Sequence, residues 1–190
     1  MSVNLVKGQK INLSKEVEGL KKVVVGLGWD AAKKGLFGAH YDIDCDASAI
    51  IIGKDNKYKG VVYYGDRKAE NGCIYHHGDN LTGDGDGDDE QITVDLKNMP
   101  DSVEKIVFVV NIYACESRKQ DFGMIKNAYI RLVDEATRKE ICKYNLSENY
   151  SGKTAMIFAE VYKKDKEWKF NAVGTGTTDG SVSELVRRYK

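Results

Sequence analysis

The sequence predicts an all-β protein, a mainly antiparallel two-sheet β-sandwich with a C-terminal helix and short peripheral helical turns. Short runs of β-branched and aromatic residues recur along the chain, Gly, Asn and Asp separate them, and helical periodicity is scarce. The 190 residues are enough for one hydrophobic core. No linker, repeat or low-complexity tract divides the chain, so we expect a single domain over residues 1–190.

The predicted strands have lengths that are normal for a sandwich, and turn-forming residues bound them. The run from Lys105 to Tyr113 is distinctive because its apolar residues do not alternate with polar ones. This pattern is typical of a central strand that is covered on both faces. In chain order, the expected strands are 20–27, 44–52, 60–64, 74–77, 90–96, 105–112, 128–133, 140–143, 155–163 and 167–175.

The clearest helical signal lies at the C-terminal end. Apolar residues recur at spacings of three and four from Val182 to Tyr189, and Ser181 with Glu184 forms the pattern of a capping box. We therefore expect this helix to lie with its apolar face against a sheet. Two shorter helical turns are expected at 99–103 and 122–127.

Charge and hydropathy exclude several classes of partner. The 29 Lys and Arg residues balance the 29 Asp and Glu residues, so no overall field favours nucleic acid or an anionic membrane. The N-terminal segment has no apolar core of signal-peptide length, and no segment approaches the roughly 18 apolar residues of a membrane span. We expect a soluble, cytoplasmic protein that does not bind nucleic acid directly.

The cysteines and histidines give no recognisable metal or redox motif. No C-x-x-C pair is present, so we do not expect a zinc ribbon or a thioredoxin-like site. We expect reduced, mostly buried thiols instead. No H-E-x-x-H spacing joins the histidines to a carboxylate, and we expect them to be neutral side chains at the surface. The residues concerned are Cys45, Cys73, Cys115 and Cys142, and His40, His76 and His77.

The segment 79–90 carries six carboxylates and three glycines in twelve residues, with no basic side chain. Carboxylates this close together repel one another, and a divalent cation removes that conflict. Calcium fits best, because it accepts about six to eight oxygen ligands at flexible geometry. The alternative is a solvated acidic turn, which would not need the alternating Gly-Asp pattern.

Two familiar calcium motifs do not fit this segment. An EF-hand loop needs Gly at its sixth position and Glu at its twelfth, between two helices. A frame that starts at Asp84 places Asp89 and Asp95 there, the frame from Asp86 fails as well, and the flanking segments are predicted strands. A β-roll is excluded because its repeat occurs only once. What remains is a site formed by acidic loops at one end of a β-scaffold.

A second acidic cluster provides the other wall of such a site. Asp42, Asp44 and Asp46 recur at a period of two, so in a strand they point to one face. Asp30, at the end of its own predicted strand, is a further candidate. The two clusters together offer more carboxylates than one calcium ion can use, so we expect two ions.

Several blocks of sequence match one family pattern, in order along nearly the whole chain. They are Gly-Leu-Gly-Trp-Asp at 26–30, Asp-Cys-Asp-Ala-Ser at 44–48, the acidic block at 77–91, and shorter blocks at 122–131, 146–148, 154–158 and 168–174. With these blocks the chain resembles the TerD family, the tellurium-resistance and general stress proteins of bacteria. The resemblance implies a β-sandwich that binds calcium at its acidic loops and acts in resistance to tellurite and other stresses.

The resemblance also implies a set of metal ligands. Two residues fall on the paired aspartates of one family block, and six fall on the acidic block. The predicted ligands are Asp44, Asp46, Asp79, Asn80, Gly83, Asp86, Asp88 and Glu90. Asp84 stands where many members have Glu, and in an ideal strand Asp88, Asp89 and Glu90 cannot all bind one ion. We therefore leave Asp30, Asp42, Asp84 and Asp89 unassigned.

The leading functional hypothesis is a calcium-binding stress-response protein of the tellurium-resistance type. It would act without catalysis, as a sensor or interaction module whose surface the ion orders for a protein partner, such as another stress-resistance protein. The alternative is a thiol-dependent or metal-dependent enzyme that acts on tellurite or another oxyanion. No base or cation is placed to activate a cysteine, so no catalytic residue is assigned. A phosphate or nucleotide binder is a third possibility, but segment 79–90 has no Lys, Arg or following helix.

Overall fold

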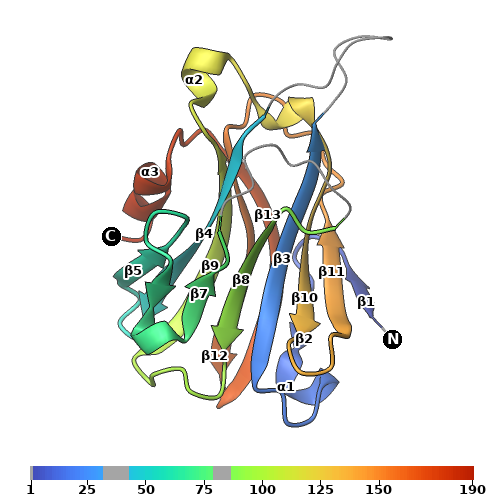
Figure 1. The fold of residues 1–190 in the computed structure, drawn as a ribbon, viewed down its shortest axis with the longest axis vertical. Helices are drawn as coiled ribbons and strands as arrows, with labels where there is room; N and C mark the ends of the chain where they lie inside the picture. The colour runs from blue at the N-terminus through green and yellow to red at the C-terminus, as the bar shows by residue number, and fades with distance from the viewer. Residues whose placement is uncertain (1, 32–42, 79–86) are drawn as a thin grey trace.

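The computed structural model describes residues 2–31, 43–78 and 87–190, and these form the predicted β-sandwich (Figure 1). Two sheets face each other across one large hydrophobic core. In spatial order, sheet A contains β1 (Val3–Leu5), β11 (Glu140–Asn145), β10 (Ile125–Asp134), β3 (Lys22–Ala31), β8 (Glu90–Asp95), β7 (Ile74–His76) and β6 (Lys68–Ala69). Sheet B contains β2 (Lys10–Asn12), β13 (Glu167–Thr177), β12 (Ala155–Lys164), β9 (Val103–Ile112), β4 (Cys45–Gly53) and β5 (Tyr58–Val62).

The helices are short and peripheral, as expected for this class of fold. They are α1 (Leu13–Glu16), the 3-10 turn η1 (Glu70–Gly72), α2 (Cys115–Arg118), the 3-10 turn η2 (Phe122–Met124) and α3 (Val182–Arg187). None of the helices in the described part of the chain has the length and apolar character needed to cross a membrane.

The ten predicted strands are all present, with ends shifted by a few residues. The sequence patterns did not predict β1, β2 and β6, which have only two or three residues each. The helical turn predicted at 99–103 was wrong, because Val103 joins β9 opposite Gly53 and its N–H closes a tight turn onto Pro100 O. The turn predicted at 122–127 is helical only as far as Met124, where β10 takes over.

The central position predicted for the run after Lys105 is confirmed. This run forms β9, which lies between β12 and β4 in sheet B. One face of β9 packs into the core between the sheets, and the other contributes Val107 and Val109 to a second apolar cluster. The predicted C-terminal helix α3 covers this second cluster with Leu185 and Val186. Ser181 caps α3 by accepting the N–H of Glu184 on its side chain.

Candidate metal site where the two sheets meet

The two acidic segments of the sequence meet in the same part of the fold. Asp44 leads into β4 of sheet B, and Glu90 begins β8 of sheet A. Cys45 lies buried between them, and burial raises the pKa of its thiol well above the ordinary value. The negative charges of four nearby carboxylates raise this pKa further, namely Asp46, Asp44, Glu90 and Asp89. The structure therefore gathers negative charge from both predicted walls around one point.

A hydrogen bond joins the two sheets at this point. The N–H of Ala47 donates to Glu90 Oε2 at 2.7 Å, and His76 Nε2 lies 3.2 Å from Ala47 O and 3.3 Å from the same Glu90 oxygen. Because His76 Nδ1 accepts the N–H of Gly78 at 3.1 Å, the ring proton lies on Nε2, which donates to the Ala47 carbonyl. β5 pairs with β4 only from Ala49 onward. Glu90 and His76 thus supply the two hydrogen bonds that a neighbouring strand would otherwise make to Ala47.

The expected surface position of His76 was therefore wrong. Its side chain is fully buried, because it follows the inward-facing Ile74 at strand spacing. His77 is exposed as expected, and its Nε2 lies 2.8 Å from Thr93 Oγ1. His40 lies outside the described residues.

Asp88 lies on the outer face of sheet A, away from Glu90. Its carboxylate forms a two-point ion pair with Arg131, with Nε to Oδ1 at 2.7 Å and Nη2 to Oδ2 at 3.0 Å. The hydroxyl of Tyr129 lies 3.0 Å from Oδ1, and Gln91 Nε2 donates to Oδ2 at 3.0 Å. The Asp88 side chain is only 1% exposed. This carboxylate, which the sequence assigned to a metal ion, is thus satisfied by protein groups.

The three consecutive acids at 88–90 point in different directions. Asp89 turns back towards β3, where its Oδ2 accepts the N–H of Trp29 at 2.7 Å and its own N–H donates to Leu27 O at 2.8 Å. Glu90 points into the sandwich, whereas Asp88 lies on the outer face of the sheet. This agrees with the expectation that the three cannot bind one ion together.

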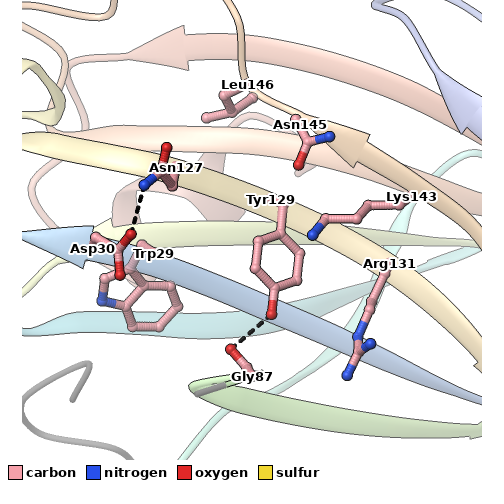
Figure 2. Close-up of a pocket in the computed structure, with 9 residues that line it drawn as sticks. All are labelled: Trp29, Asp30, Gly87, Asn127, Tyr129, Arg131, Lys143, Asn145 and Leu146. Atoms are coloured by element: carbon pink, nitrogen blue, oxygen red, sulfur yellow. Dashed lines mark hydrogen bonds between the residues drawn. The ribbon is translucent and has the colours of Figure 1, made fainter. Parts of the chain in front are cut away.

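Beside Asp88, the outer face of sheet A carries a polar pocket of about 510 Å³. Figure 2 shows the Tyr129 hydroxyl pointing to the carbonyl of Gly87, a hydrogen bond of 2.7 Å. Lys143 Nζ lies 3.7 Å from the centroid of the Tyr129 ring. Asp30, one of the four acids left unassigned, accepts a hydrogen bond from Asn127 Nδ2 at 2.7 Å. The pocket wall therefore holds the end of the acidic segment against the sheet.

Four predicted ligands lie outside the described residues, together with the unassigned Asp42 and Asp84. They are Asp79, Asn80, Gly83 and Asp86. Among residues 2–31, 43–78 and 87–190, no group of three or more His, Cys, Asp or Glu side chains is arranged to hold a metal ion. The described carboxylates supply suitable charge and oxygen atoms, and by themselves they form no complete metal site.

The TerD domain pattern matches residues 1–189. The chain belongs to the TerD family. Stress response protein SCP2 of Bacillus subtilis (strain 168) is 50% identical to it over 198 residues, which cover 100% of both chains. Tellurium resistance protein TerD of Serratia marcescens is 42% identical over 186 residues, which cover 96% of this chain and 95% of that protein.

A solved structure shows the same fold at lower sequence similarity. The crystal structure of SCO6318 from Streptomyces coelicolor A3(2), described as a homologue of telluride resistance protein (TerD), matches this TerD domain with a TM-score of 0.70. The sequence identity is 22%, and the match covers 90% of this chain and 99% of that one. At this identity the comparison supports the TerD sandwich fold alone.

The contacts of Asp88 with Arg131 and Tyr129 on the outer face of sheet A are called the Asp88 anchor below. The glycines of the 26–30 block of this TerD domain provide the space for it. A Cβ added at Gly26 would overlap the Asp88 carboxylate, and one added at Gly28 would lie 2.5 Å from the Tyr129 ring. Both glycines lie on β3, facing outward between buried neighbours. The absence of side chains here lets Asp88 and Tyr129 lie flat on the sheet.

Gly28→Ala should therefore destabilise the protein by about 1–3 kcal/mol, the usual cost of forcing an extra methyl group into a packed site. Urea denaturation monitored by circular dichroism measures this change. Gly60→Ala is the matched control, because Gly60 also lies in a strand and the nearest atom to an added Cβ is 3.8 Å away. Equal stability of the two variants would show that Tyr129 does not need the space above Gly28.

Proposed function

We propose that this TerD-family chain is a calcium-binding stress-response protein of the tellurium-resistance type that acts without catalysis. One observation carries the proposal: residues 44–46 and Glu90, which are distant in sequence, meet where Glu90 Oε2 accepts the N–H of Ala47, the residue after Asp46, at 2.7 Å. Concentrated negative charge is costly unless a cation compensates it. Residues 79–86, which precede Glu90 in the sequence, add three more aspartates.

The donor chemistry favours calcium over a transition metal. The predicted ligands offer only oxygen atoms, and a hard cation with flexible coordination accepts them. We assign Asp44, Asp46, Glu90 and the ligands predicted within 79–86 to two calcium ions. For Asp88 we propose an anchoring role in place of the ligand role, because Arg131 already pairs with both of its oxygens.

The state of the thiols argues against the thiol-dependent enzyme. All four cysteines are unpaired and buried. Burial raises the pKa of Cys142 to about 12 and also raises the pKa values of Cys45 and Cys73, which disfavours the reactive thiolate. Unpaired thiols also fit the reducing cytoplasm, where we place the protein. We propose that calcium orders the acidic segments into a surface for a protein partner.

Calcium titration by isothermal calorimetry tests the proposal. We expect saturable binding in the unmodified protein and loss of binding in Asp79→Ala and Asp86→Ala. The two substitutions each remove an oxygen ligand, and the remaining carboxylates do not replace it at the same position. A thermal melt provides a second readout, because calcium at a hundredfold excess over its Kd should add about 2.7 kcal/mol of stability.

Glu18→Ala is the matched control for these variants. Glu18 is an exposed acid that precedes β3, at the strand end opposite Trp29. It removes the same charge far from the proposed site, so its calcium affinity should equal that of the unmodified protein. If Asp79→Ala and Asp86→Ala bind calcium as tightly as Glu18→Ala, the acidic segment is not the calcium site.

A further inference from the structure

The outer face of β4 changes from apolar to polar along its length. Ile50 and Ile52 face outward and are covered by α3. Towards the start of β4, this outer face carries Ser48 and Asp46, beyond the part that α3 covers. Asp46 pairs with Asn111 of the neighbouring strand β9. This polar end lies on sheet B. It is separate from the Asp88 anchor, which lies on the outer face of sheet A.

A pocket of about 200 Å³ lies above these polar residues. Its walls are three tyrosine rings, Tyr63, Tyr64 and Tyr113, together with the residues that lead into α3. Tyr64 and Tyr113 are 42% and 48% exposed, and they are two of the three large hydrophobic side chains that are exposed in the described part of the chain. Exposed aromatic rings around a polar floor are typical of a binding site.

The floor of the pocket contains buried hydrogen-bonding atoms without a partner in the described part of the chain. Asn111 Nδ2 faces Asp46 Oδ2 at 3.4 Å, and this contact turns Asn111 Oδ1 the other way. Among the described residues, neither Asn111 Oδ1 nor Ser48 Oγ has a hydrogen-bond partner, and both atoms are buried. Buried polar atoms of this kind are costly unless a ligand satisfies them.

We propose that this pocket binds a primary alkylammonium group. Such a group carries three N–H donors, which match the Asp46 carboxylate, Asn111 Oδ1 and Ser48 Oγ. A carboxylate accepts several hydrogen bonds at once, so Asp46 can bind an ammonium N–H in addition to its protein contacts, of which Asn111 Nδ2 is one. The tyrosine rings cover the alkyl stem and attract the positive charge through their faces.

The size and lining of the pocket select an organic cation. A volume of about 200 Å³ accommodates one long side chain and is far larger than a bare metal ion needs. The floor offers one carboxylate and two neutral oxygens, fewer than the roughly six ligands that calcium takes, so a calcium ion bound by Asp46 needs ligands from outside this pocket. The ammonium group could belong to a lysine side chain of a protein or to a free alkylamine, and the test separates these sources.

The test uses calorimetry on the full chain in buffer with EGTA, so that calcium does not engage Asp46. The probes are the blocked peptide acetyl-Gly-Lys-Gly-amide, the same peptide with norleucine in place of lysine, and n-butylammonium chloride. We expect the lysine peptide to bind saturably and the norleucine peptide not to bind. Binding of n-butylammonium with equal affinity identifies a free-amine site, and binding of the lysine peptide alone identifies a protein lysine as the ligand.

Ser48→Ala and Tyr113→Ala locate the binding. Ser48→Ala should weaken the lysine peptide about tenfold, the effect of losing one hydrogen bond to a charged group. The variant should fold normally, because it removes a hydroxyl that has no partner. Tyr113→Ala removes an exposed wall and should also weaken binding, whereas Ser151→Ala, an exposed serine on another loop, should not.

The proposal is overturned if the lysine peptide does not bind, if the norleucine peptide binds equally well, or if neither Ser48→Ala nor Tyr113→Ala changes the affinity. Ser48 and Tyr113 are not predicted calcium ligands, so calcium titration of Ser48→Ala should match the unmodified protein. A failure of the ammonium site can therefore be distinguished from a failure of the calcium site.

Discussion

Arg131→Ala should lower the free energy of unfolding by about 3–5 kcal/mol, the cost of removing one partner from a buried ion pair. The substitution leaves the Asp88 carboxylate, whose side chain is 1% exposed, without its cation. Arg131 itself is 31% exposed, so water can enter in its place, and we expect a value near the lower end of the range. Urea denaturation followed by circular dichroism measures the loss.

Two further variants separate the charge effect from lost packing. In the double variant Arg131→Ala/Asp88→Ala the buried charge is gone, so part of the stability should return, which a double-mutant cycle reports as coupling. Arg187→Ala, an exposed arginine on α3, is the control and should change stability by less than about 0.5 kcal/mol. A loss below about 1 kcal/mol for Arg131→Ala would mean that the pair behaves as a solvated surface pair.

The Asp88 anchor shows where inference from sequence stops. In an ideal strand, alternation would place Asp88 and Glu90 on one face and Asp89 on the other. In the structure β8 begins only at Glu90, and Asp88 is drawn to the outer face by Arg131, which is 43 residues away in sequence. The glycines at 26 and 28 were visible as part of a family block, but their role depends on Asp88 and Tyr129, which arrive from other strands.

The strands themselves were predictable because short β-branched and aromatic runs, separated by turn-forming residues, mark them. Residues 44–52 and 105–112 lie in the middle of sheet B, where burial on both faces requires apolar residues at nearly every position. The short strands β1, β2 and β6 lie at or near sheet edges, where two or three residues form no pattern. His76 was missed for a different reason, since its partner Ala47 belongs to the other sheet.

Glu90→Ala should cost about 3–4 kcal/mol, from an unsatisfied buried N–H at Ala47, a lost hydrogen bond to a charged group and a cavity in the core. The Glu90 side chain is fully buried, so the Ala47 N–H is not open to bulk solvent. His76→Ala removes the neighbouring hydrogen bond to Ala47, so the two effects should not be additive. Chemical denaturation of both single variants and the double variant measures this coupling.

Glu90→Gln distinguishes a structural role from a ligand role. The glutamine carbonyl accepts the Ala47 N–H as the carboxylate does, so this variant should retain most of the stability that Glu90→Ala loses. Its charge is gone, however, and a neutral amide is a weaker calcium ligand than a carboxylate. If Glu90 also binds calcium, Glu90→Gln should show near-normal unfolding in EGTA and reduced calcium affinity by calorimetry. Unchanged calcium affinity would limit Glu90 to joining the two sheets and would leave the calcium ligands to residues 44–46 and 79–86.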